Sequence, residues 1–234
     1  MLVSMKAKAA RQATRKVAAR KRRSARGRPP AEEVAARAER LLDVATEVFL
    51  EEGFQGASMS KIARRAGASK QTLYARYPSK AALFAALVER RASHLFETLG
   101  PLGDDRSLRE TLVNFGCALL NLILSEEGQG LYRVVIAECM ESPELGEVFW
   151  KLGPGRTRAI IADYLRTQQK LGTIQCGDPT HAVSVLHALL VSEASLRVTL
   201  GLNTGTLQTQ AQRKAWVNFA VDTFLASMQA GASR

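Results

Sequence analysis

The sequence predicts an all-α fold, with a small N-terminal helical domain followed by a larger helical domain. Apolar residues recur at helical spacing in each long segment, and clusters of Gly, Pro and Ser separate these segments. No segment shows the alternation of a β-strand. With 234 residues, of which 46% are apolar, the chain is long enough to bury a substantial core.

The N-terminal helices have clear start and stop signals. The segment from residue 31 to Gly53 has acids in its first turn, apolar residues at helical spacing and a glycine at its end. Three helices follow it, broken by Gly67, by Pro78 and by the turn residues of 100–103. Each is preceded by a serine suited to cap its first turn, namely Ser58, Ser69 and Ser79.

Six further helices are predicted in the C-terminal part of the chain. They lie near residues 105–125, 129–141, 144–151, 154–171, 178–200 and 207–230. The last two are long and markedly apolar.

The net charge of +11 is confined to the N-terminus. Residues 1–30 contain eleven Lys or Arg and no acid, and the rest of the chain is neutral in sum. Such a block gains free energy against a polyanion because each phosphate contact releases counterions. A solvated extension without a partner and an Arg-rich targeting peptide remain alternatives.

A second stretch with basic residues and without acids lies inside the folded region. Between Gly53 and Val88 there is no Asp or Glu. The bases in this stretch are Lys61, Arg64, Arg65, Lys70, Arg76 and Lys80. We therefore expect a nucleic-acid surface there rather than an ordinary salt-bridged one.

Several other classes of protein are disfavoured. Cys117, Cys139 and Cys176 are widely spaced and mostly in apolar surroundings, which predicts a reducing, cytoplasmic compartment. No run approaches the ~18 apolar residues of a membrane span, so we expect a soluble protein without a membrane partner. Metal-ligand spacings, cofactor motifs and catalytic motifs are missing, so we expect no metal, no cofactor and no enzymatic activity.

The second and third predicted helices have the spacing of a helix-turn-helix. In this motif a small residue lies where the helices cross, a glycine suits the turn, and an apolar residue anchors the second helix. Ala63, Gly67 and Leu73 meet these demands at intervals of four and six, with Ile62 opposite Leu73. The second helix of such a unit enters the major groove of DNA.

Residues 41–88 resemble the DNA-binding domain of the TetR family of bacterial transcriptional regulators. The resemblance includes the Phe-x-x-x-Gly-Phe link from Phe49 to Phe54 and a second motif formed by Leu73, Tyr74, Tyr77 and Lys80. It implies a DNA-binding domain over residues 31–80 and a helical effector-binding and dimerisation domain over 81–234.

The start of the second helix of the motif is predicted to contact base edges. Gln71 is our first choice for sequence discrimination because a Gln side chain can pair bidentately with adenine. In the family pattern, Tyr74 and Arg76 contact the sugar-phosphate backbone, and Lys80 would bind a further phosphate. Tyr77 is expected in the core. The full predicted DNA-binding set is Arg26, Arg28, Ser58, Ser69, Lys70, Gln71, Thr72, Tyr74, Arg76 and Lys80.

The resemblance also suggests how the basic segment at residues 1–30 could bind DNA. Its "RGRPP" stretch resembles arms that lie in a narrow A·T-rich minor groove, where Arg26 and Arg28 would meet enhanced negative potential.

The C-terminal domain holds candidate effector-binding residues. A few polar groups among aromatic and aliphatic ones are typical of a small-molecule site, although a helical core has the same composition. The candidates are Asn114, Phe115, Cys117, Leu120, Tyr132, Glu138, Trp150, Tyr164 and His187.

Apolar stripes on the last two helices predict the dimer contact, since the family's usual dimer pairs two such helices from each subunit. An intramolecular core is the alternative. The stripes contain Val183, Leu186, Leu190 and Leu196 in one helix and Trp216, Phe219, Ala220, Phe224 and Met228 in the other. The interface residues expected from them are Val183, Leu186, Leu190, Trp216 and Phe224.

Together, the patterns and the resemblance predict a homodimeric transcriptional repressor. It would bind a palindromic operator in double-stranded DNA and be released by a small-molecule effector. The alternatives are an activator of the same fold, and a basic structural or RNA-binding protein that acts through its N-terminal segment.

Overall fold

The structure, a computed structural model, describes residues 31–103 and 105–230. The chain divides into two compact units, residues 1–40 and 41–234, and helix α2 (Ala31–Gly56) runs from the first into the second. The predicted arm over residues 1–30, with Arg26 and Arg28, lies outside the described residues.

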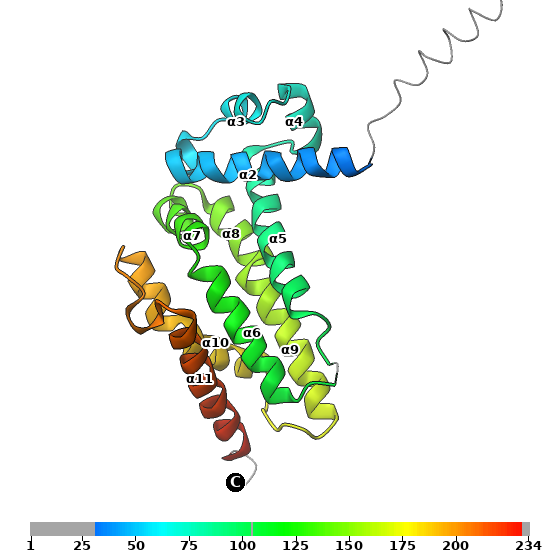
Figure 1. The fold of residues 1–234 in the computed structure, drawn as a ribbon, viewed down its shortest axis with the longest axis vertical. Coiled ribbons are helices and arrows are strands. Elements are labelled where there is room, and N and C mark those ends of the chain that lie inside the picture. Colours follow the sequence, from blue (N-terminus) through cyan, green and yellow to red (C-terminus); the bar gives the residue numbers. More distant parts are fainter. Residues whose placement is uncertain (1–30, 104, 231–234) are drawn as a thin grey trace, which may run out of the picture. The chain divides into compact units, whose positions relative to one another are not determined.

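The described residues form helices and connecting turns without a strand, as predicted (Figure 1). The helices after α2 are α3 (Met59–Arg65), α4 (Lys70–Arg76), α5 (Lys80–Leu99), α6 (Leu108–Ile123), α7 (Glu126–Glu138), α8 (Pro143–Leu152), α9 (Pro154–Lys170), α10 (Pro179–Thr199) and α11 (Gln210–Ala230). A short 3-10 helix, η1 (Gly205–Leu207), precedes α11, so the single helix predicted from residue 207 starts later.

The predicted capping serines are confirmed. Ser58, Ser69 and Ser79 have extended backbones, and each side-chain oxygen accepts a hydrogen bond from the amide three residues further on. These bonds satisfy amides that a helix leaves without an internal partner at its N-terminus. The three helix starts are therefore determined by local sequence.

The first core, within residues 41–234, lies beneath α3 and α4. Phe49, Phe54 and Phe84 pack ring against ring, with centroids 5.5–5.8 Å apart. Leu131 and Val135 of α7 belong to the same buried cluster. The core of the predicted DNA-binding domain thus extends into helices assigned to the second domain.

Helix α5 contributes to two cores. Leu83 and Leu87 lie in the first, whereas Leu95 and Leu99 lie in the second, which is formed mainly by α6, α9, α10 and α11. The predicted boundary after residue 80 falls at the start of this shared helix.

A bend near the C-terminal end of α2 is held by a side chain from α7. Gly53 has φ 72° and ψ 180°, a conformation that is essentially restricted to glycine. After this break the carboxylate of Glu138 accepts the amides of Phe54, at 2.8 Å, and Gln55, at 2.6 Å. We call residues 53–57 the link.

Glu138, which is predicted to line an effector site, contacts the link in the structure. Both carboxylate oxygens accept backbone N–H groups of the link, so Glu138 connects α7 to the DNA-binding helices. On the same link, the Lys80 ammonium donates to the carbonyls of Gln55 and Ala57, each at 3.0 Å.

The assignment of the dimer contact to the two apolar stripes is corrected. Val183, Leu186, Leu190 and Phe224 are at most 3% exposed because they pack into the second core of their own chain. A residue already buried inside one subunit cannot supply an interface. The apolar side chains that remain exposed on these helices are Val185, Leu196, Leu200 and Phe219.

Helix α10 is long and apolar enough to cross a membrane, and so is the bent pair α6 and α7. Core helices of soluble proteins pass the same test, and α10 packs against α9 and α11. Length and composition are therefore weak evidence for a membrane span.

The bend at Gly53 gives a first prediction. A Cβ at Gly53 would lie 2.2 Å from a Glu138 carboxylate oxygen and would also strain the backbone, so Gly53→Ala should lower the free energy of unfolding by about 1–3 kcal/mol. Gly56→Ala is the matched control, because a Cβ there meets Glu52 Cβ at an ordinary 3.5 Å. Thermal unfolding measures both, and equal stability of the two variants would contradict the proposed constraint.

Candidate nucleic-acid interface

Helices α3 and α4 form the predicted helix-turn-helix. Ile62 and Leu73 are fully buried, and Ala63, at 1% exposed, allows the helices to approach closely. The turn closes with a 2.9 Å hydrogen bond from the Ala68 amide to the Ala63 carbonyl. Gly67 has φ 66°, which suits glycine in this turn.

The N-terminal end of α4 presents exposed polar side chains. Ser69, Lys70, Gln71 and Thr72 are all exposed. The Ser69 and Thr72 hydroxyls are 2.8 Å apart and hydrogen-bond to each other. Lys70 and Gln71 have no such partner within the described residues, so both are available to contact a ligand.

The remaining predicted contacts on α4 and its flanks differ in availability. Tyr74 is 47% exposed, in agreement with a phosphate-facing position, whereas Tyr77 is buried as predicted. Arg76 is exposed, and its Nε donates to the Tyr77 hydroxyl at 3.2 Å. The Lys80 ammonium uses two of its donors on the link and keeps one N–H for the predicted phosphate contact.

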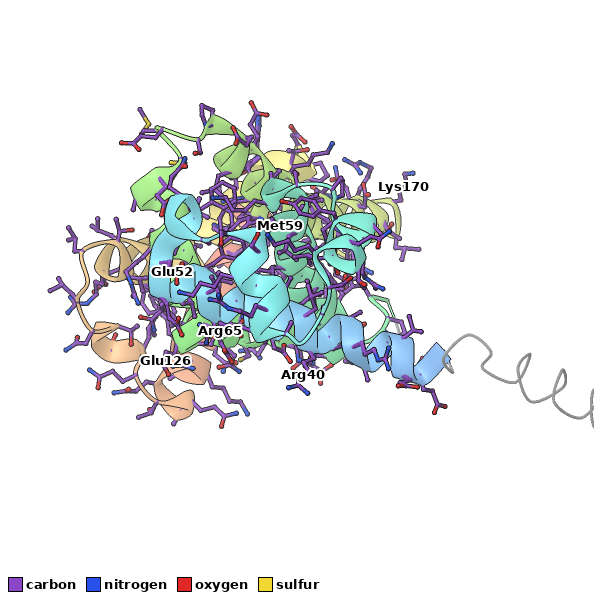
Figure 2. All side chains as sticks on the ribbon, turned by 90° about the horizontal axis from the view of Figure 1, so that it is seen from above. Arg40, Glu52, Met59, Arg65, Glu126 and Lys170 are labelled. Atoms are coloured by element: carbon purple, nitrogen blue, oxygen red, sulfur yellow. The ribbon has the colours of Figure 1, made fainter. Side chains whose placement is uncertain are left out.

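Two of the six bases in the acid-free stretch are neutralised by acids of α2. Lys61 pairs with Glu52, and Arg65 pairs with both Glu47 and Glu51. Arg65 and Glu52 are labelled in Figure 2. The hydrogen bond from Arg65 lowers the pKa of the Glu51 carboxyl. The expectation of a nucleic-acid surface rather than an ordinary salt-bridged one therefore does not hold at these two bases, because acids outside the stretch reach them.

An open hollow of about 590 Å³ lies between the starts of α3 and α4. Its lining residues are Ser58, Ser60, Lys61, Ala63, Arg64, Ala68 and Lys70. It brings the predicted Ser58 and Lys70 together with two residues missing from the predicted site, Ser60 and Arg64. Arg64 is exposed and has no ion pair within the part of the chain that the structure describes, a distinction that sequence spacing could not make.

Comparison with known proteins places both parts of the chain in one family. A model of bacterial regulatory proteins of the TetR family matches residues 41–87. A second model, described as the C-terminal domain of AefR-like transcriptional repressors, matches residues 110–229, which is half of the chain. The chain belongs to the TetR family.

Other TetR-family proteins share the whole fold. The solved structure of a Mesorhizobium loti protein assigned to this family is 28% identical, with a TM-score of 0.70 over 82% of this chain and 96% of that one. The flavonoid-responsive regulator FrrA is also 28% identical, with a TM-score of 0.67 over 82% of this chain and 97% of its own. These relatives indicate a transcriptional regulator rather than an enzyme.

A third relative matches over a shorter stretch of the chain. The transcriptional activator FasR of Mycolicibacterium smegmatis is 39% identical over 74 residues, which is 32% of each chain.

Within the C-terminal domain of this TetR-family chain, two predicted effector residues meet at a third that the sequence analysis missed. Arg158 donates from Nη2 to Nδ1 of His187 at 2.9 Å, and its guanidinium lies 4.9 Å from the centre of the Trp150 ring. The signal for Arg158 is its spacing, since it precedes the buried Ile161 and Leu165 by three and seven residues on α9.

The other effector candidates do not gather at that point. Asn114 is exposed, while Phe115 and Tyr164 are buried in the second core. Leu120 is buried in that core as well. Tyr132 is half-buried and packs on Phe149, with ring centroids 6.1 Å apart. Cys117 is half-buried, and burial raises the pKa of its thiol.

Groups of three or more metal-ligating side chains are missing from the described ranges.

The surroundings of His187 give a prediction on pH dependence. Burial, assisted by the positive charge of Arg158, lowers the pKa of His187 from 6.5 to about 4. The unfolded chain therefore binds this proton first, and stability should fall as the pH drops from 6.5 to 4, by at most about 3 kcal/mol. Denaturant unfolding of the wild type and His187→Gln across this range measures the effect. Parallel pH profiles for the two proteins would contradict it.

Proposed function

We propose that the protein is a cytoplasmic, homodimeric repressor that binds a palindromic operator and leaves it when a small molecule binds the C-terminal domain. The observation that carries the DNA-binding part is the exposed, acid-free start of α4, where Lys70 and Gln71 have no side-chain partner among the described residues. A helix in this motif enters the major groove with its N-terminal residues toward base edges.

Base discrimination is assigned to Gln71. Ser69 and Thr72 hydrogen-bond to each other and to their own helix start, so their hydroxyls have less capacity left for bases. The Gln71 amide is exposed and can offer one donor and one acceptor to the edge of adenine. Tyr74, Arg64 and Lys70 would contact phosphates, which orient the protein without specifying sequence.

The repressor assignment rests on the C-terminal half. The model that matches residues 110–229 is described as belonging to transcriptional repressors. The similarity to the activator FasR covers only 32% of the chain, so it is the weaker support for the sign of regulation. Transcription from a bound promoter, measured with and without the protein, tests whether the protein represses or activates. Repression requires less transcript when the protein is added.

The dimer contact is assigned to the exposed face of α10 and α11. Val185, Leu196 and Phe219 are 46%, 60% and 61% exposed, which is unusual for large apolar side chains on adjoining helices. Trp216 is half-buried beside Phe219, with ring centroids 5.7 Å apart. Pairing this face with its copy about a two-fold axis would bury these side chains.

The link provides a route from the C-terminal domain to DNA. Glu138 lies at the end of α7, the helix that also carries Tyr132, and holds the link through two backbone amides. A shift of α7 would therefore move the link and the start of α3. An effector reduces operator affinity by its preference for the shifted arrangement. FrrA, which has the same fold, is named as a flavonoid-responsive regulator, and this supports a ligand-responsive C-terminal domain here.

The base-reading role of Gln71 predicts a change in specificity. Gln71→Ala should lose preference for one base in each half-site, by about 1–3 kcal/mol, because a bidentate contact is removed. Tyr74→Phe is the control, since loss of a phosphate contact should weaken all sites alike. Selection from randomised duplexes measures both. An unchanged base preference in Gln71→Ala would show that Gln71 does not read the operator.

The corrected interface gives a prediction on assembly. Phe219→Glu would bury an unpaired charge in the dimer at a cost of about 3–5 kcal/mol, so the variant should be monomeric at micromolar concentration and bind the operator weakly. Leu171→Glu, at an exposed leucine after α9, is the control and should remain dimeric. Sedimentation measures assembly, and circular dichroism checks folding. Dimeric Phe219→Glu would place the interface elsewhere.

A further inference from the structure

Arg158 is a partly buried cation with an incomplete set of partners. Its Nη1 group is buried and has no hydrogen-bond partner in the described structure, and Nη2 donates to His187. Burial lowers the pKa of the guanidinium. No salt bridge to Arg158 occurs within residues 31–103 and 105–230. A buried N–H group without an acceptor is unfavourable, and so is a buried charge without a counter-ion.

Two other arginines show which partners a structural arginine has in this chain. Arg91, which is also half-buried, pairs with Glu127 at 2.7 Å while donating to the Leu122 carbonyl and the Ser125 hydroxyl. Arg156, on the same helix as Arg158, pairs with Glu89 at 3.3 Å. Each has a carboxylate partner, whereas Arg158 has a histidine in that position.

The histidine supplies no negative charge and adds no positive one. A guanidinium only donates hydrogen bonds, so Nδ1 of His187 is the acceptor and its proton is on Nε2. Burial and the adjacent guanidinium favour this neutral form at neutral pH. The Trp150–Arg158–His187 cluster therefore carries one net positive charge.

We propose that Arg158 binds the carboxylate of a small-molecule effector, with Nη1 as the donor that the ligand satisfies. This inference rests on the proposed function, since it names the chemical class of the effector. A planar carboxylate matches the guanidinium geometry, and its single charge balances that of the cluster. A phosphate dianion would need a second cation, which His187 in its neutral form does not supply.

Trp150 allows a ligand to reach this group. Its indole covers one face of the guanidinium and is itself 56% exposed. Displacing an exposed ring loses little buried area, so the face of the guanidinium under the indole can be uncovered at modest cost. An aromatic or aliphatic ligand body could then pack on the indole while its carboxylate meets Arg158.

The test uses the full-length protein and a panel of carboxylates, each paired with its primary amide: benzoate, 4-hydroxybenzoate, indole-3-acetate and octanoate. Calorimetry should show that the wild type binds at least one carboxylate more tightly than the matching amide. Arg158→Gln should weaken that binding by about 10–100-fold, the loss expected for a charge-assisted hydrogen bond. Arg158→Lys should retain part of it, and the neighbouring Arg156→Gln should bind like the wild type.

Thermal unfolding without ligand separates ligand binding from a structural role. Arg158→Gln should be at least as stable as the wild type, because it removes a desolvated charge. A structural role predicts instead that the variant melts earlier and that its folded form binds the panel unchanged. That result would overturn the proposal, and so would a wild type that binds no member of the panel or binds amides equally well.

Operator binding, measured in the same samples, tests the proposed function separately. If a carboxylate binds through Arg158 but leaves operator affinity unchanged, the repressor mechanism fails while the ligand site stands. If operator affinity responds to a neutral amide as strongly in Arg158→Gln as in the wild type, the carboxylate assignment fails while the mechanism stands.

Discussion

The contact between Glu138 and the link is the constraint on which the DNA-binding face depends. Gly53 turns the chain out of α2 and leaves the next amides without helical carbonyls. A carboxylate from a residue 84 positions away accepts the Phe54 amide, and the Gln55 amide binds its other oxygen. A Cβ at Gly53 would force the Glu138 carboxylate to shift, and a residue other than glycine would be strained at φ 72°. The direction in which the chain enters α3 is thus set by α7.

Lys80 binds the same link with a charge opposite to that of Glu138. Its ammonium binds the carbonyls of Gln55 and Ala57 and lies 4.7 Å from the centre of the Phe54 ring. Carbonyls of the link therefore meet a cation, and its amides meet an anion. Since Lys80 begins α5, which contributes side chains to both cores, the link is tied to two helices of the C-terminal domain.

Contacts between residues far apart in the sequence also determine which charged side chains are paired. Acids of α2 neutralise Lys61 and Arg65, whereas Arg64 and Lys70 have no ion pair among the described residues and lie around the open hollow at the starts of α3 and α4. In the C-terminal domain Arg158 is half-buried, and no described acid pairs with it. Unpaired cations at these two places are the strongest local indications of ligands, one a polyanion and the other a small carboxylate.

The sequence by itself determined the helices and their starts, because a capping serine, a breaking glycine and an apolar period act within a few residues. It also determined the helix-turn-helix, through Ala63, Gly67 and Leu73, and the TetR family. The roles of Glu138 and Arg158 were decided by tertiary structure, since their partners lie on other helices. Tertiary structure also decided which face of α10 is exposed. Apolar residues occur on both sides of this helix, and only its packing against α9 and α11 shows that Leu190 is covered and Leu196 is not.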